Sequence, residues 1–139
     1  MTTTTTAILE IMRLNARYNF AIDAGDADAW ASCFTQDGVF HALLEGHTPK
    51  GTEELAAFVP VCVEAFGAMH HLTTNEVIEV HGDTATQNCY LQFLAEKDGQ
   101  LQANICIYRD ELRLEDGAWR YADRKVDFKR QFAAHTATV

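Results

Sequence analysis

Two neighbouring histidines, His70 and His71, are the side chains of this sequence best suited to acid–base chemistry. An imidazole changes its charge near neutral pH, so it can accept or donate a proton under mild conditions. The segment MHHLTTN, residues 69–75, has the composition of the start of a strand. Because successive side chains of a strand point to opposite faces, only one of the two rings can face a pocket.

Asp23 is the side chain expected to pair with one of these histidines. It falls in the last turn of a predicted helix, where the negative end of the helix dipole disfavours an anion. A carboxylate that accepts a hydrogen bond from one ring nitrogen fixes the tautomer and leaves the other nitrogen free as a base. A nearby imidazolium would also explain the position of Asp23. The alternative is a solvated residue at the end of the helix.

Tyr18 and Arg124 are two further candidates for the same cavity. Tyr18 lies five residues before Asp23, which is about 140° round a helix, so both side chains can border one space. A core aromatic residue is the alternative. Arg124, in the last predicted strand, can meet a buried polar group, or it can be a surface charge like its neighbours. The remaining histidines are weaker candidates: His41, His47, His81 and His135.

Apolar residues that recur every three or four positions predict three helices in the first half of the chain. The first is expected to bury Tyr18, Phe20 and Ile22. Thr52 is expected to cap the third helix, and Pro60 to kink or divide it. The predicted helices cover residues 7–24, 27–34 and 52–66.

The second half of the chain is rich in β-branched and aromatic residues separated by turn signals. The segments HGD, KDGQ and EDG predict three hairpins. Helices followed by an antiparallel meander are typical of an α+β domain in which the helices cover one face of a curved sheet. Polar and apolar residues mixed on both faces favour an enclosed pocket, and a sheet with one wet face is the alternative. The predicted strands cover residues 39–44, 70–80, 84–95, 101–115 and 118–129.

Length and composition indicate one domain over residues 1–139, with residues 1–6 disordered and residues 130–139 forming a tail. The net charge of −9 argues against a nucleic-acid surface, and no apolar run is long enough for a membrane span. The cysteines form no CxxC pair and are interpreted as reduced core residues of a cytoplasmic protein without a metal site. These cysteines are Cys33, Cys62, Cys89 and Cys106.

Four segments resemble the SnoaL-like branch of the nuclear-transport-factor-two-like superfamily. Its members include polyketide cyclases, ketosteroid isomerase relatives, scytalone dehydratase, bile acid 7α-dehydratase and hexachlorocyclohexane dehydrochlorinase. The resemblance covers nearly the whole chain and implies a cone-shaped α+β barrel in which three helices and a mostly antiparallel sheet enclose a pocket. The segments are RYNFAIDAGDADAWASCFTQDGVF, GTEEL, HHLTTN and DGAWRYADRKV.

The resemblance also implies roles for single residues. In the dehydratase and dehydrochlorinase members an aspartate at the end of the first helix pairs with a histidine ahead of the TN segment, and these positions are Asp23 and His71 here. Tyr18 matches a tyrosine of the bile acid dehydratase pattern, and Arg124 is the nearest match to an arginine of the final strand. Members commonly form dimers or trimers, so a homodimer or homotrimer is expected.

The expected function is that of a cofactor-independent lyase, a dehydratase or related elimination enzyme for a small apolar cyclic or polyketide-like molecule. No phosphate-binding glycine loop, GxSxG or HExxH motif points to other chemistry. Alternatives are an isomerase or cyclase, and a non-catalytic binding module. If the protein is a binding module, we expect Asp23 and His71 to lie too far apart for a hydrogen bond, or side chains to fill the cavity. The expected apolar wall consists of Trp30, Phe34, Phe58, Met69 and Tyr90.

Overall fold

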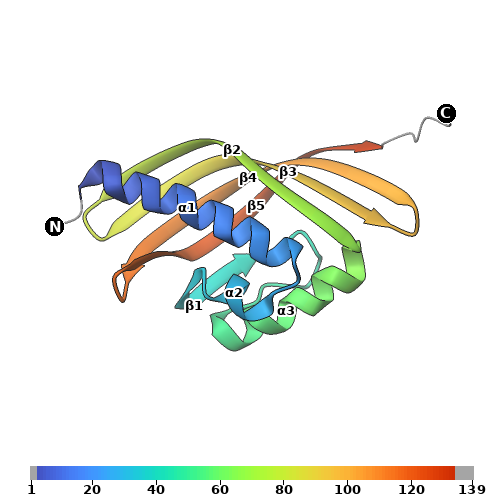
Figure 1. The fold of residues 1–139 in the computed structure, drawn as a ribbon, viewed down its shortest axis with the longest axis horizontal. Helices are drawn as coiled ribbons and strands as arrows, with labels where there is room; N and C mark the ends of the chain where they lie inside the picture. Colours follow the sequence, from blue (N-terminus) through green and yellow to red (C-terminus); the bar gives the residue numbers. More distant parts are fainter. Residues whose placement is uncertain (1–2, 134–139) are drawn as a thin grey trace.

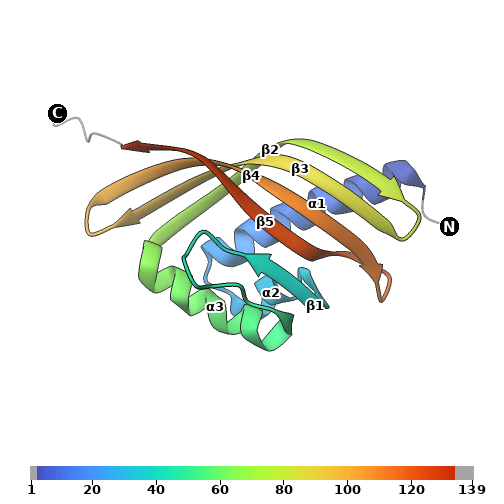
Figure 2. The same cartoon turned by 180° about the vertical axis from the view of Figure 1, so that it is seen from behind.

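The computed structural model describes residues 3–133, and the predicted α+β class is confirmed. Helix α1 lies along one face of a curved sheet, and α2 and α3 lie beside its lower end (Figure 1). Seen from behind, the strands lie in front of α1 (Figure 2). The helices are α1 (Thr4–Asp23), α2 (Ala27–Ala31) and α3 (Gly51–Phe66). The strands are β1 (Phe34–His41), β2 (Ala68–His81), β3 (Thr84–Lys97), β4 (Gln100–Glu115) and β5 (Ala118–Ala133).

The sheet is open, although the resemblance implied a barrel. Its strand order is β1-β5-β4-β3-β2, so β1 and β2 form its two edges and do not pair with each other. Only β1 runs parallel to its neighbour, and the other pairs are antiparallel. Helix α1 packs against β2 and α3 packs against β1. The helices therefore cover the gap between the edges, and the sheet and helices together enclose the core.

The three predicted hairpins are confirmed, and they connect β2 to β5 in sequence. Asp98 and Gly99 have φ values of 53° and 77°, and Asp116 and Gly117 have φ values of 51° and 77°. Positive φ at both central residues is typical of a type I′ turn, whose twist matches that of the flanking strands. The two Asp-Gly pairs thus have the backbone conformation that the sequence predicted.

Helix α1 begins earlier than predicted and buries fewer of the expected side chains. The Oγ1 atom of Thr3 accepts a hydrogen bond from the backbone N–H of Thr6, so the chain is helical from Thr4 onward and not disordered there. Tyr18 and Ile22 are buried as predicted, but Phe20 is 78% exposed. A residue two positions along a helix lies about 200° away, so Phe20 and Tyr18 face opposite directions.

Other predicted boundaries shift by several residues. Helix α2 ends at Ala31, and Phe34 already pairs with Tyr121 in β1, so the predicted helix over 27–34 is too long and the predicted strand over 39–44 starts too late. At the other end of the chain β5 continues to Ala133, and residues 134–139 lie outside the described residues.

Helix α3 also differs from its prediction. It continues through Pro60 as one helix, so Pro60 does not divide it. Its N-cap is Lys50 in place of Thr52, and the Lys50 backbone N–H donates to Glu54 Oε2 over 2.8 Å. The face that α3 buries includes Phe58 and Cys62, and the first of these reaches the site described below.

The four cysteines are free and buried, as predicted. Burial raises the pKa of the Cys33 and Cys106 thiols to about 11 and that of the Cys62 and Cys89 thiols to about 12. All four therefore stay protonated at neutral pH and act as small apolar core residues. Within residues 3–133, none of the helices has the length and hydropathy needed to cross a membrane.

Candidate functional site

Asp23 and His71 are hydrogen-bonded to each other, as predicted. His71 Nδ1 lies 2.6 Å from Asp23 Oδ1, and the backbone N–H of His71 donates to Asp23 Oδ2 over 2.9 Å. Because an ionised carboxylate only accepts hydrogen bonds, Nδ1 is the donor in this contact, and in the neutral ring Nε2 then presents its lone pair. Two donors from one residue thus satisfy an anion at the unfavourable end of α1.

The position of His71 in the sheet makes this contact possible. Strand β2 is an edge strand, so the His71 backbone N–H points away from β3 and is free to meet Asp23. Across the strand pair His71 lies opposite Phe93, with ring centroids 4.7 Å apart. His70 points to the opposite face and is exposed. The alternation of the strand therefore selects His71 as the ring that faces inward.

His71 lines a small apolar cavity between α1, α3 and the inner face of the sheet. The cavity has a volume of about 50 Å³, well below the ~300 Å³ of a typical ligand pocket. Its wall includes three of the residues expected there, Trp30, Phe58 and Met69. Among the described residues, none forms a hydrogen bond with His71 Nε2. The Nε2 atom of His71, a residue of the cavity wall, is thus available to a ligand.

Two of the expected wall residues lie elsewhere. Phe34 is buried behind the wall, where its ring packs against Trp30 with centroids 5.0 Å apart. Tyr90 was predicted wrongly, because it is 46% exposed on the outer face of the sheet. Odd-numbered residues of β3 between Ala85 and Ala95 point inward, so an even-numbered residue cannot reach the cavity.

Tyr18 lies in the wall of the same cavity and is 1% exposed. Its hydroxyl accepts a hydrogen bond from the hydroxyl of Tyr108 over 3.5 Å. Burial raises the pKa of Tyr18 to about 12, although the positive charge of Arg124 opposes this shift. The phenol of Tyr18 is therefore protonated at physiological pH and can donate a hydrogen bond.

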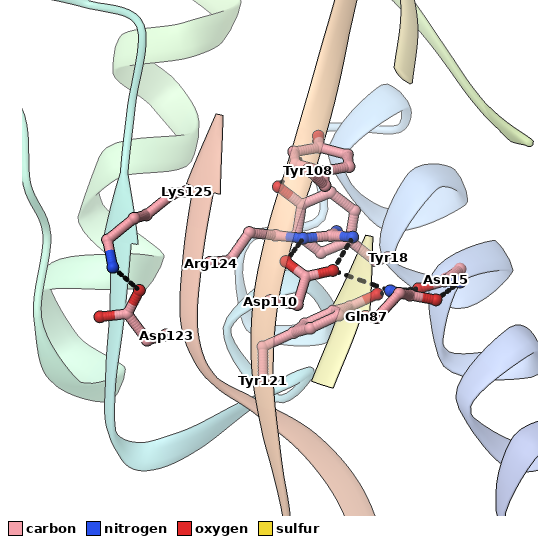
Figure 3. A network of polar contacts seen from close by, with 9 residues as sticks. All are labelled: Asn15, Tyr18, Gln87, Tyr108, Asp110, Tyr121, Asp123, Arg124 and Lys125. Atoms are coloured by element: carbon pink, nitrogen blue, oxygen red, sulfur yellow. Dashed lines mark hydrogen bonds and ion pairs between the residues drawn. The ribbon is translucent and has the colours of Figure 1, made fainter. Parts of the chain in front are cut away.

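Arg124 is buried and is not a surface charge. Its Nε and Nη2 donate to Asp110 Oδ1 and Oδ2 over 2.8 and 3.1 Å (Figure 3). Its guanidinium carbon lies 3.6, 3.9 and 4.4 Å from the ring centroids of Tyr108, Tyr121 and Tyr18. The cation is thus enclosed by aromatic rings, two of which line the cavity, while Arg124 itself is not part of the wall.

Sequence reasoning missed Tyr108 in the cavity wall and the polar partners behind the wall, Gln87 and Asp110. Gln87 and Asp110 lie directly opposite each other on β3 and β4, and Arg124 lies opposite Asp110 on β5. The Gln87 amide donates to Asp110 Oδ2 over 2.7 Å and exchanges two hydrogen bonds with Asn15 of α1 (Figure 3). Gln87 and Asp110 both fall at positions that alternate with outward-facing residues of their strands, and two such polar residues on adjacent strands could have indicated this network.

Comparison with protein families gives a match over residues 3–125 to the SnoaL-like domain. The chain belongs to the SnoaL-like family. The resemblance seen in the sequence is therefore confirmed, and the match spans almost all of the described residues. A comparison with functionally curated proteins gave no match.

Several solved structures have a fold similar to that of this chain. A protein of unknown function from Mycobacterium tuberculosis is 32% identical with a TM-score of 0.80, covering 88% of this chain and 72% of that chain. A proposed aromatic ring hydroxylase from Novosphingobium aromaticivorans is 25% identical with a TM-score of 0.83, covering 95% and 96%. A hexachlorocyclohexane dehydrochlorinase is 17% identical with a TM-score of 0.85, covering 97% and 93%, which shows a shared fold.

Proposed function

We propose that this SnoaL-like protein is a cofactor-independent lyase that removes water or a similar leaving group from a small apolar cyclic or polyketide-like substrate. The observation that carries the proposal is the hydrogen bond between Asp23 and His71 in the wall of an apolar cavity. The His71 side chain is only 10% exposed, so its base would act away from bulk water.

In the proposed reaction His71 Nε2 takes a proton from a carbon atom of the substrate. The electron pair of the broken C–H bond forms a carbon–carbon double bond, and the leaving group departs with the electrons of its own bond. Asp23 holds the imidazole in the required tautomer and stabilises the imidazolium that forms. The negative end of α1 acts in the same direction, since it favours a cation beside Asp23.

Tyr18 would assist the departing group or an adjacent carbonyl oxygen. Because Tyr108 donates to the oxygen of Tyr18, the proton of Tyr18 is free to point into the cavity. A hydrogen bond to developing negative charge in a dry site contributes about 3 kcal/mol to the transition state. Arg124 would act as a positioning residue, since its guanidinium packs against both tyrosine rings.

Substrate access requires the connection over residues 42–50 to open. Leu43 and Leu44 of this connection contribute to the cavity wall. Its base is fixed by a hydrogen bond from the Phe40 backbone N–H to the Pro49 carbonyl over 3.1 Å, whereas Leu43 is 44% exposed. We propose that this connection moves outward while its base stays in place, enlarging the cavity for the substrate.

The small cavity is also the one observation that favours a non-catalytic module, because side chains fill most of the space. The two accounts differ in one result, which is turnover. A panel of small alicyclic β-hydroxy ketones and β-halo ketones, followed by mass spectrometry, would detect loss of water or of hydrogen halide. An isomerase would convert a substrate without any change of mass.

The matched variants are His71→Ala, Asp23→Ala and His70→Ala. The lyase account expects the first two to lose turnover of any active panel member, while His70→Ala keeps it because His70 points away from the cavity. All three should keep a cooperative thermal transition. Full activity of His71→Ala would refute the proposed base, and binding without turnover across the panel would support the module.

A further inference from the structure

A second and larger hollow lies on the other side of α1. It is an open groove of about 630 Å³ between α1, α2 and the start of β5, more than ten times the volume of the central cavity of about 50 Å³. Nothing in the proposed lyase reaction uses it. Its volume falls within the ~300–1,000 Å³ of small-molecule sites.

Small side chains create the groove. It is lined by Ala16 of α1, Ala24 at the C-cap of α1 and Ala29 of α2, and all three are exposed. Where such residues face each other across two elements, no side chain fills the space between the backbones. Phe20 also lines the groove with 78% of its surface exposed. Its ring therefore adds apolar surface to the edge of the groove.

Two arginines give the groove a positive character. Arg17 of α1 and Arg120 of β5 both line it, and within residues 3–132 neither forms an ion pair. Arg120 Nη1 donates to the carbonyl oxygen of Ser32, which fixes the side chain, while its Nε is buried without a partner among the described residues. The groove therefore holds two guanidinium groups that no carboxylate pairs with among the described residues.

Asp26 is the one carboxylate that lines the groove. Its Oδ1 accepts the backbone N–H of Ala29 over 3.1 Å and caps α2, so that oxygen is already engaged. Cys33 also lines the groove, and the pKa of its thiol depends on the charged groups nearby. Burial raises the pKa of its thiol to about 11, and Arg17, Arg124 and Arg120 oppose this rise, with no carboxylate adding to it. Arg17 and Arg120 are thus close enough to Cys33 to favour an anion there.

We propose that this groove binds a small organic oxyanion, a carboxylate or phosphate monoester attached to an apolar ring or chain. The forked guanidinium groups of Arg17 and Arg120 suit the paired oxygens of such a group. Phe20 and the alanines would contact the apolar part of the ligand. Arg17 and Phe20 stand three positions apart on α1, so they lie on one helix face and can contact both parts of one molecule.

The test uses three probes of the same ring system, 2-naphthoate, 2-naphthyl phosphate and the uncharged 2-naphthylmethanol, titrated into the full-length protein by calorimetry. We expect one or both anions to bind at least tenfold more tightly than the alcohol, and their order identifies the oxyanion. Arg17→Gln, an exposed change that leaves the core intact, should weaken anion binding at least tenfold. Arg120→Gln should have a similar effect.

Two further variants separate the groove from general charge. Arg130→Gln removes the same charge from an exposed site on β5 outside the groove and should bind as the unchanged protein does. Ala16→Trp fills the groove without removing charge and should abolish binding. Equal binding of the alcohol, unchanged binding in Arg17→Gln, equal loss in Arg130→Gln, or no saturable binding at millimolar concentration would each overturn the proposal.

Discussion

The two hollows beside α1 differ in size and in the residues that line them, although one stretch of the helix serves both. Tyr18 faces a small apolar cavity of about 50 Å³. Arg17 and Phe20, its near neighbours in sequence, face an open groove of about 630 Å³. The segment RYNFAID therefore carries residues for both sides of one helix, because each residue turns about 100° from the last.

Burial determines the protonation state and the partners of the polar groups in the two hollows. In the cavity Tyr18 is nearly inaccessible, and its pKa is raised to about 12, so it is a fixed donor. Arg124 behind it requires Asp110 as a partner, since a buried charge without one is costly. In the groove Arg17 is hydrated and needs no partner in the protein. The inner site therefore suits proton transfer, and the outer one suits reversible binding of a charged ligand.

The largest expected difference between the two regions is the change in the free energy of unfolding when an arginine is replaced. Arg124→Met leaves Asp110 buried without its ion pair and should lower the free energy of unfolding by about 3–5 kcal/mol. Arg17→Met, on the exposed face, should change it by less than about 0.5 kcal/mol. Urea unfolding of both variants measures the difference, and equal losses would mean that the two arginines are not distinguished by burial.

Alkaline pH should destabilise the protein through the buried tyrosines of the inner region. Burial raises the pKa values of Tyr18, Tyr108 and Tyr121 above the usual 10.0. Above pH 10 the unfolded chain loses these protons while the folded chain keeps them, so stability falls as pH rises. Each tyrosine contributes a decline of up to about 1.4 kcal/mol per pH unit in that range. Urea unfolding at several pH values measures it.

A tyrosine variant provides the control for this experiment. Tyr18→Phe removes one of the three groups and should make the decline above pH 10 less steep. The same slope in the variant and in the unchanged protein would show that Tyr18 ionises at the same pH in both states.

Thiol reactivity should differ slightly between the two hollows. Cys33 lines the groove and Cys62 lines the cavity, and burial raises their pKa values to about 11 and about 12. Because burial raises the pKa of Cys62 further, Cys33 should react faster with iodoacetamide. Mass spectrometry of labelled peptides under native conditions measures both rates. Faster labelling of Cys62 would contradict this order.

Parts of this picture could be predicted from the sequence where local chemistry decides the structure. The Asp-Gly pairs at 98–99 and 116–117 predicted two hairpin turns, because few other residues tolerate positive φ. The pairing of Asp23 with one of the two histidines was predicted from their chemistry. The choice of His71 came from the resemblance to a family, since the separation of two residues along the chain does not give their distance in space. The helices were predicted from periodicity, with their ends displaced by several residues.

The rest depends on strand register and tertiary packing. Tyr90 was placed in the cavity because both parities of β3 mix polar and apolar residues, and Gln87 on the inner parity is as polar as any outer residue. Asp110 and Arg124 meet only when β4 and β5 are in register. The groove is formed by residues of α1, α2 and β5, which are distant in sequence, so no local pattern could predict it.

The dependence of kcat/KM on pH for the active member of the ketone panel tests the central claim most directly. If His71 is the base, activity should fall in acid and rise with pH to a plateau, because only an unprotonated imidazole can accept the substrate proton. If Tyr18 is the donor, activity should then stay level to about pH 11, since the Tyr18 pKa is about 12. A flat profile between about pH 5 and 8, or a fall with rising pH in that range, would contradict the account.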